Sequence, residues 1–181
     1  MPTYVAFLRA INLGPKRKFA KADIVAATEA AGATDVETYI NTGNVRLTTP
    51  LRSRARVESA LEEAYLAQAG FDVPTIAFTP AELAAVAADA AELTRPDLQR
   101  HYLYLLKDEP DADRVAALLA RDGVTDRVVV RGRAAHLLHG AEYQAGGVDP
   151  WGIEKALGVV ATNRNLNVVT TLAQRWCSRP G

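Results

Sequence analysis

The order in which hydrophobic spacing changes along the first 78 residues is the strongest constraint on the fold. Tyr4 to Ile11 is apolar on both faces, which is typical of a central strand. Helical spacing follows from about Ala20 to Ala31 and ends before a glycine. Two alternating segments, 36–40 and 45–49, then flank a short polar turn and predict a β-hairpin.

A second helix and a fourth strand complete this first pattern. Apolar residues recur at helical spacing over 53–69, and residues 73–78 are typical of a strand. Glu62 and Glu63 are interpreted as part of the solvated face of that helix. The resulting order, βαββαβ, predicts a ferredoxin-like lobe.

The second part of the chain begins like the first. Thr79 to Glu82 has a capping hydroxyl, proline at the first helical position and a glutamate three residues after the cap, so it predicts a connecting helix. The elements expected next are strand 101–107, helix 111–121, strand 127–131 and strand 135–139.

The pattern then departs from the first. We expect a loop through Tyr143, Gly146 and Gly147, a short helix at 150–157, and a final helix from about Leu166 to Trp176 in place of a clear last strand. The predicted fold is α+β, with two ferredoxin-like βαββαβ-type lobes, the second incomplete or modified, and antiparallel sheets with helices packed on one face. The expected domains are an N-terminal lobe at 1–79, a helical connector at 80–98 and a C-terminal α+β lobe at 99–181.

Charge and cysteine content narrow the classes of function. Lys and Arg together number 21, as do Asp and Glu, so no long-range field attracts the chain to nucleic acid or anionic lipid. No segment reaches the roughly 20 apolar residues of a membrane span, and no membrane partner is expected. The single cysteine, Cys177, excludes an internal disulfide and a structural zinc site, which favours a reducing cytoplasm.

The predicted topology gathers polar residues at one edge of the first sheet. In a ferredoxin-like lobe, the end of strand one, the loop after it and the tip of the hairpin lie at the same edge. The side chains expected there are Arg9, Asn12, Lys16, Asn41, Thr42 and Asn44. They could bind an anion or a carbonyl, but Asn and Gly at a hairpin tip are also explained by the turn itself.

A second polar run precedes the last predicted helix. Thr162 or Asn165 is a credible helix cap, and Asn167 follows closely. Arg164 opposes the helix dipole unless an anion or a carboxylate lies nearby, so we predict either a ligand or an internal acidic partner for it.

Established catalytic and metal-binding patterns are absent from the sequence. His136 and His139 point to opposite faces of a predicted strand, and His101 is far from both in sequence. The sequence contains no Walker loop, no GxGxxG and no GxSxG. We therefore expect no metal and no cofactor, and the catalytic residues, if any exist, are unknown.

Three motifs carry a resemblance to a known family. They are Arg9-Ala10-Ile11-Asn12-Leu13-Gly14 with Ala22-Asp23, Tyr39-Ile40-Asn41-Thr42-Gly43-Asn44-Val45, and Ile153-Glu154-Lys155 through Asn167. Over nearly its whole length the chain resembles the bacterial family of domain of unknown function 1697. The resemblance implies a cytoplasmic bacterial protein with this fold, and no established reaction.

Three departures from the family pattern are visible. Ala10 stands where the family usually has glycine, and Leu166 stands where it usually has tryptophan. Residues 148–151 replace an expected Ser-Lys type motif. Any activity that depends on those positions would be altered here.

The function best supported by the sequence is a binding module for a small anionic or polar ligand at the polar edge of the N-terminal sheet. The alternatives are a nucleic-acid-binding protein, which the zero net charge disfavours, and an enzyme acting on a small polar or phosphorylated metabolite. An interaction or scaffold protein is a further possibility, and the sequence makes no prediction of the oligomeric state.

Overall fold

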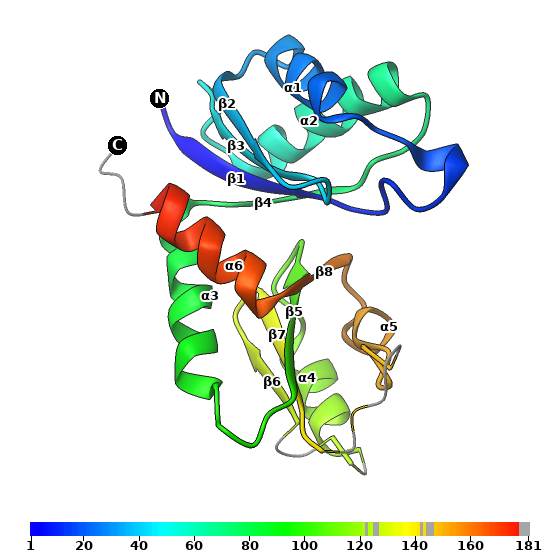
Figure 1. The fold of residues 1–181 in the computed structure, drawn as a ribbon, viewed down its shortest axis with the longest axis vertical. Helices are drawn as coiled ribbons and strands as arrows, with labels where there is room; N and C mark the ends of the chain where they lie inside the picture. The colour runs from blue at the N-terminus through cyan, green and yellow to red at the C-terminus, as the bar shows by residue number, and fades with distance from the viewer. Residues whose placement is uncertain (122, 125–126, 142, 144–146, 178–181) are drawn as a thin grey trace. The chain divides into compact units, whose positions relative to one another are not determined.

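The computed structural model describes residues 1–121, 123–124, 127–141, 143 and 147–177 (Figure 1). Gly146, which the sequence analysis places in a loop, lies outside the described residues. The chain divides into two compact units. One comprises residues 1–84 and the segment from Leu172 onward, and the other comprises residues 85–171.

The first unit has the predicted ferredoxin-like order. Its elements are β1 (Thr3–Leu8), the 3₁₀ turn η1 (Pro15–Arg17), α1 (Lys21–Ala30), β2 (Thr34–Tyr39), β3 (Asn44–Thr48), α2 (Arg54–Ala69) and β4 (Thr75–Phe78). The four strands form one antiparallel sheet in the order β2-β3-β1-β4. The prediction of a βαββαβ lobe is therefore confirmed.

The core of this unit lies between the sheet and its two helices. Ile24 of α1 and Leu61 and Tyr65 of α2 pack with Ala6 and Leu8 of β1, and all five are buried. Val5 and Phe7, which alternate with these positions along β1, are also buried, as expected of a central strand.

Two glutamates of α2 protect the free edge of this sheet. The Glu62 carboxylate accepts a hydrogen bond from the Thr75 backbone N–H at 2.8 Å, and Glu58 accepts one from Ala77 at 2.9 Å. Because β4 is an edge strand, its unpaired N–H groups would otherwise be open to another chain. The interpretation of Glu62 as a solvated residue was wrong, since the reach of α2 over β4 is a tertiary contact.

The second unit repeats the topology of the first. Its elements are the C-terminal part of α3 (Pro80–Leu93), β5 (Arg100–Leu106), α4 (Ala112–Leu119), β6 (Val128–Arg131), β7 (Ala134–His139), α5 (Ile153–Leu157), β8 (Ala161–Asn165) and α6 (Leu166–Leu172). A π-helical turn, η2 (Ala173–Cys177), follows α6 and belongs to the first unit. The strand order β6-β7-β5-β8 is equivalent to that of the first sheet.

The expected absence of a last strand was wrong. Ala161–Asn165 forms β8, which pairs with β5 in antiparallel register from Leu106↔Ala161 to Tyr102↔Asn165. The segment is mostly polar, so periodicity did not reveal it. Its strand conformation depends on hydrogen bonding to β5 rather than on an apolar pattern.

Local signals elsewhere in the chain act as predicted. The Thr79 hydroxyl accepts from the Glu82 N–H at 3.2 Å, and the Glu82 carboxylate accepts from the Thr79 N–H at 2.7 Å, which confirms the capping box. Leu118 of α4 and Leu157 of α5 pack against Leu106 and Leu137 on one face of the sheet.

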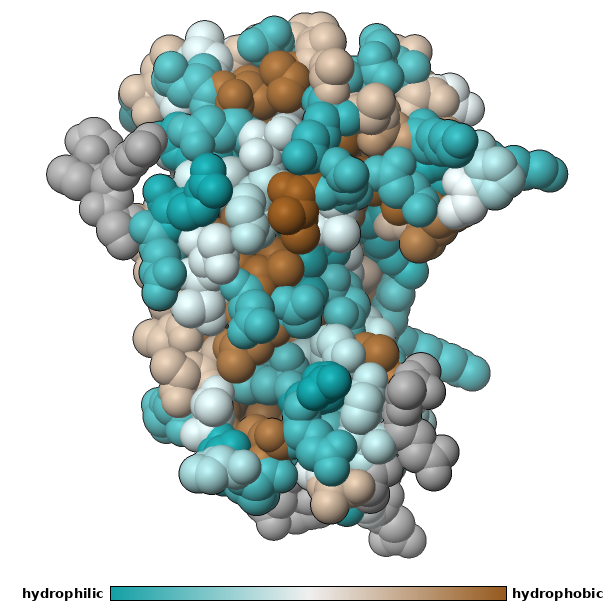
Figure 2. All heavy atoms as spheres, in the orientation of Figure 1, coloured by the Kyte–Doolittle hydropathy of each residue, from teal (hydrophilic) through white to brown (hydrophobic). Residues whose placement is uncertain are grey.

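No helix in the described part of the chain has the length and apolar character needed to cross a bilayer. Hydrophilic and hydrophobic residues are interspersed over the face drawn in Figure 2.

Gly43 allows the hairpin tip to pack against the end of β1. Its φ is +73°, and its carbonyl accepts a hydrogen bond from the Leu8 N–H at 2.8 Å. A Cβ at this position would lie 2.7 Å from Leu8 Cβ and 2.9 Å from Ile11 Cδ1. The turn thus requires glycine for both its backbone conformation and its close approach.

We expect Gly43→Ala to lower the free energy of unfolding by about 2–4 kcal/mol, because it combines left-handed strain with overpacking. Gly32→Ala is the matched control, since Gly32 has φ +85° and open space around its Cβ position. That variant should lose only about 1 kcal/mol. Urea denaturation measures both, and equal losses would contradict the close-packing argument.

Candidate functional site

The structure brings the predicted polar residues of the first lobe to one edge. Asn44 pairs with Phe7 at the end of β1 and with Tyr39 at the end of β2. The Asn12 Nδ2 donates to the Asn41 carbonyl at 2.9 Å, across 29 residues of sequence. The loop after β1 therefore contacts the hairpin tip, as the topology predicts.

The two asparagines at this edge bind mainly to the chain itself. Asn12 Oδ1 accepts from the Phe19 N–H at 3.0 Å, and its Nδ2 also approaches the Phe19 carbonyl. Asn44 is fully buried, and its Nδ2 donates to the Tyr39 carbonyl at 3.0 Å and to the Thr42 hydroxyl at 2.9 Å. These bonds favour the interpretation that Asn12 and Asn44 hold the loop and the hairpin in place.

Arg17, in the loop after β1, is held in place by contacts with two other segments of the first unit. Its guanidinium donates to the carbonyls of Ala10 and Asp72 and lies 4.6 Å from the centroid of the Phe71 ring. Lys16 remains exposed on the same turn, and Arg9 is half-buried. The sequence places the basic run Lys16-Arg17-Lys18 in this loop, and in the structure Arg17 ties the loop to the one before β4.

A shallow hollow of about 420 Å³ opens beside this loop. Asn12, Gly14, Lys18, Phe19 and Ala20 line it. Of the predicted site residues in this lobe, only Asn12 lines the hollow. A role for the other residues in binding a ligand stays a prediction.

The second predicted group lies on and after β8, in the other unit. Arg164 is buried on the strand, where its Nη1 donates to the Thr162 hydroxyl at 2.9 Å and to the Asn163 carbonyl at 2.7 Å. Burial lowers the pKa of its guanidinium to about 10. Arg164 therefore does not begin a helix, so the dipole argument does not apply to it.

Asn165 is the helix cap that the sequence predicted. Its Oδ1 accepts from the Val168 N–H at 2.9 Å at the start of α6. Asn167 is exposed on the first turn of the helix.

Asn165 and Asn167 line a hollow of about 350 Å³ at the end of the second sheet. Two arginines that sequence reasoning missed, Arg95 and Arg100, line the same hollow. The other lining residues are Thr94, Leu98, Gln99, His101, Tyr102 and Leu166. The missed arginines carry no motif. Arg100 is brought to the asparagines by the pairing of β5 with β8, and Arg95 by the loop that leads from α3 into β5.

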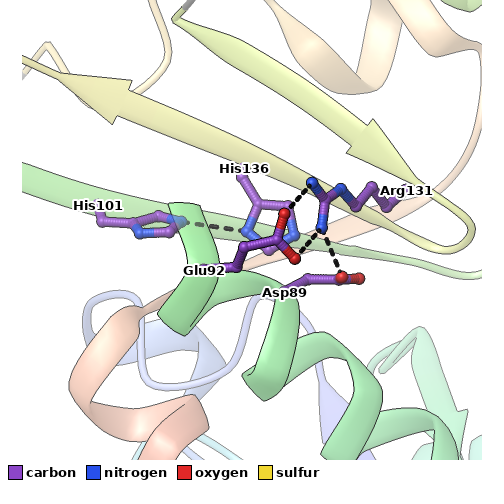
Figure 3. Close-up of polar contacts among 5 residues, drawn as sticks. All are labelled: Asp89, Glu92, His101, Arg131 and His136. Atoms are coloured by element: carbon purple, nitrogen blue, oxygen red, sulfur yellow. Dashed lines mark hydrogen bonds and ion pairs between the residues drawn. The ribbon is translucent and has the colours of Figure 1, made fainter. Parts of the chain in front are cut away.

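A buried histidine pair occupies the face of this sheet opposite α4 and α5. His101 Nε2 lies 3.1 Å from His136 Nδ1, on the diagonal of the β5–β7 ladder (Figure 3). Burial lowers the pKa of each imidazole to about 4, and for His136 the neighbouring His101 and Arg131 contribute further. Both rings are therefore neutral at pH 7.

An ion-pair network lies beside this pair. The Arg131 guanidinium, from β6, donates to Asp89 at 2.7 Å and to both carboxylate oxygens of Glu92 at 3.1 Å, both on α3 (Figure 3). Within the described residues, His101 Nδ1 and His136 Nε2 have no hydrogen-bond partner. No three His, Cys, Asp or Glu side chains in that part of the chain are grouped to hold a metal ion.

The sequence analysis predicts that His136 and His139 point to opposite faces of a strand, and the structure shows this orientation. His139 stacks on Trp151, with ring centroids 5.4 Å apart, whereas His136 contacts His101. The His101–His136 contact was missed because it depends on the register of two strands 35 residues apart.

A comparison with protein families identifies the family of this chain. A family model described as "Protein of unknown function (DUF1697)" matches residues 1–136. The chain belongs to this family. The third motif of the sequence analysis, at 153–167, lies beyond the matched DUF1697 residues.

Among solved structures, this DUF1697 protein is similar to one described as the structure of conserved bacterial protein SP0830 from Streptococcus pneumoniae. The two share 20% sequence identity with a TM-score of 0.73, over 96% of this chain and 97% of the other. This likeness supports the fold alone. No curated protein matches the chain.

The backbone conformation of Ala10 has a physical cost. Ala10 has φ +56°, a left-handed conformation that costs an L-residue about 1–2 kcal/mol and that glycine adopts freely. We expect Ala10→Gly to raise the free energy of unfolding by about 0.5–1 kcal/mol after the greater entropy of unfolded glycine is included. Ala31→Gly, at φ −73°, is the control and should lower it. Urea denaturation of both variants tests this, and a destabilised Ala10→Gly protein would contradict it.

The histidine pair predicts a specific loss of stability in acid. The folded pKa of about 4 lies below the unfolded value near 6.5, so each imidazole contributes stability that is present above pH 6.5 and lost as the pH falls toward 4. Between pH 7 and pH 4.5 the loss should be roughly 2 kcal/mol per imidazole. Urea denaturation of the native protein and of His101→Gln/His136→Gln at both pH values measures it. An equal pH dependence of the two proteins would contradict the assignment, and either single variant replaces the double one if that does not fold.

Proposed function

We propose that this DUF1697 protein is a binding module for a small anionic or polar ligand. The sequence analysis places the site at the edge of the N-terminal sheet. The geometry gives better support to the hollow of the second unit, which contains Asn165 and Asn167 of the predicted set.

The observation that carries the proposal is that two arginines and three residues with carboxamide side chains line one hollow. Arg95, Arg100, Gln99, Asn165 and Asn167 all line it. Guanidinium and amide N–H groups are the donors that phosphate and carboxylate oxygens prefer. A hollow of about 350 Å³ is within the size range of small-molecule sites.

The contacts of the arginines within the protein support this function. Arg95 forms an ion pair with Asp97 at 3.4 Å, and Arg100 Nη1 donates to the Gln99 carbonyl at 2.7 Å. These bonds use only some of the five N–H donors of each guanidinium. The remaining donors are the groups that we assign to ligand recognition.

His101 adds a neutral group to the same hollow. It lines the hollow and is 7% exposed. Because its imidazole is uncharged at pH 7, the positive charge of the site comes from the two arginines. We place this binding function in the cytoplasm of a bacterium, the setting implied by the family resemblance and the single cysteine.

Calorimetric titration with inorganic pyrophosphate at low ionic strength tests the proposal. We expect Arg100→Ala to weaken binding roughly 10-fold, because it removes a charge-assisted hydrogen-bond donor. Arg56→Ala removes an exposed arginine of α2 in the other unit and should leave the affinity unchanged.

Lys16→Ala separates the two candidate sites. If the anion binds at the N-terminal edge, Lys16→Ala weakens binding and Arg100→Ala does not, which would contradict the site proposed here. Equal binding by all three variants and the native protein would contradict both sites.

A further inference from the structure

A cluster of aromatic rings lies at the same end of the second sheet as the anion-binding hollow. His139 stacks on Trp151 at an interplanar angle of 14° and meets Tyr143 edge-on, with centroids 5.0 Å apart. Tyr102 completes the cluster, 5.9 Å from His139 and 6.3 Å from Tyr143. Four rings from β5, β7 and the segment before α5 thus form one group.

The cluster borders a second hollow of about 400 Å³. His139, Tyr143, Pro150 and Trp151 line it, together with Arg127. The His139 ring is held in place by its Nε2, which lies 2.9 Å from the Val148 carbonyl. Tyr143 and Trp151 are only half-buried, so ring surface remains accessible to a ligand.

Arg100 and Tyr102 connect the two hollows. Both residues line the first hollow. The Arg100 guanidinium lies 5.8 Å from the centroid of the Tyr143 ring, and the Tyr102 hydroxyl lies 3.2 Å from that of Tyr143. Strand register agrees, since Arg100 pairs directly with His139. A guanidinium site and an aromatic site therefore lie next to each other, linked by the contacts of Arg100 and Tyr102 with Tyr143.

These two neighbouring sites together suit a ligand that has both an aromatic group and a phosphate. A flat aromatic group stacks on Tyr, Trp and His rings, and a phosphate binds guanidinium groups. A nucleotide carries both groups a few bonds apart and is the ligand class that this pairing of sites fits best. The alternative is that the rings only pack against one another, in which case an aromatic group on the ligand adds nothing to affinity.

We propose that the ligand of this protein is a mononucleotide, with its phosphate at Arg95 and Arg100 and its base against Tyr143 and Trp151. This inference rests on the proposed anion-binding function and adds the substrate class. The balanced charge of the chain favours a free nucleotide over a long nucleic acid, whose phosphates would need an extended basic surface.

Calorimetry on the native protein with AMP, GMP, CMP, UMP and ribose 5-phosphate tests the inference. Because base stacking on an aromatic ring is sequence-tolerant, at least one of the four nucleotides should bind roughly 5- to 150-fold more tightly than ribose 5-phosphate. Tyr143→Ala should remove most of that difference, measured as the ratio of the nucleotide affinity to the ribose 5-phosphate affinity of the same variant. Tyr39→Ala, on β2 of the other unit, is the matched control and should change neither.

Tryptophan fluorescence gives an independent readout. The chain has two tryptophans, and Trp176→Phe leaves Trp151 as the only one. The nucleotide that binds most tightly should quench this fluorescence to saturation, and ribose 5-phosphate should not. Quenching of the native protein that Trp151→Phe abolishes is the equivalent result if Trp176→Phe does not fold.

The outcomes separate the two proposals. Equal affinities for ribose 5-phosphate and all four nucleotides, without quenching, would overturn the nucleotide inference and leave anion binding intact. Absence of binding by every compound, inorganic pyrophosphate included, would overturn both.

Discussion

The antiparallel pairing of one central strand with two neighbours is the constraint on which each unit depends. β1 lies between β3 and β4, and β5 lies between β7 and β8. In each unit this pairing fixes which loops lie at the same edge of the sheet. The helical crossover returns the second strand in the same direction as the first, so both strands end at the edge where the hairpin turn lies. The Asn12–Asn41 contact in the first unit and the Arg100–His139 pair in the second both follow from it.

The two units use similar topology for different local chemistry. In the first, polar groups at the sheet edge are bonded to backbone, and Gly43, Asn44 and Arg17 fix a hairpin and two loops. In the second, two arginines and two asparagines line one hollow, with aromatic rings beside it. Arginine side chains keep spare donors after they have bound the protein, whereas a fully buried carboxamide such as that of Asn44 is inaccessible to a ligand.

Much of the fold was predictable, because strand and helix periodicities in the first 78 residues differ clearly. The last strand was not, because Thr162 and Arg164 of β8 carry no apolar alternation and are ordered by pairing with β5. Of the candidate site, Asn165 was recognised through its capping role, which is a local signal. Arg100 and the His101–His136 pair were not, because each depends on strand register, and Arg95 was not, because it lies in the loop between α3 and β5 and carries no motif.

The sequence by itself determined the βαββαβ order, the helix caps and the hairpin tip, all of which are set by interactions within a few residues. It also determined the family, through short motifs. Only the tertiary structure decided that Glu62 protects a strand edge, that His101 meets His136, and that Arg100 lies over Tyr143. The physical reason is that these contacts join residues 13, 35 and 43 positions apart, and only the packing of helices, strands and loops against one another brings them together.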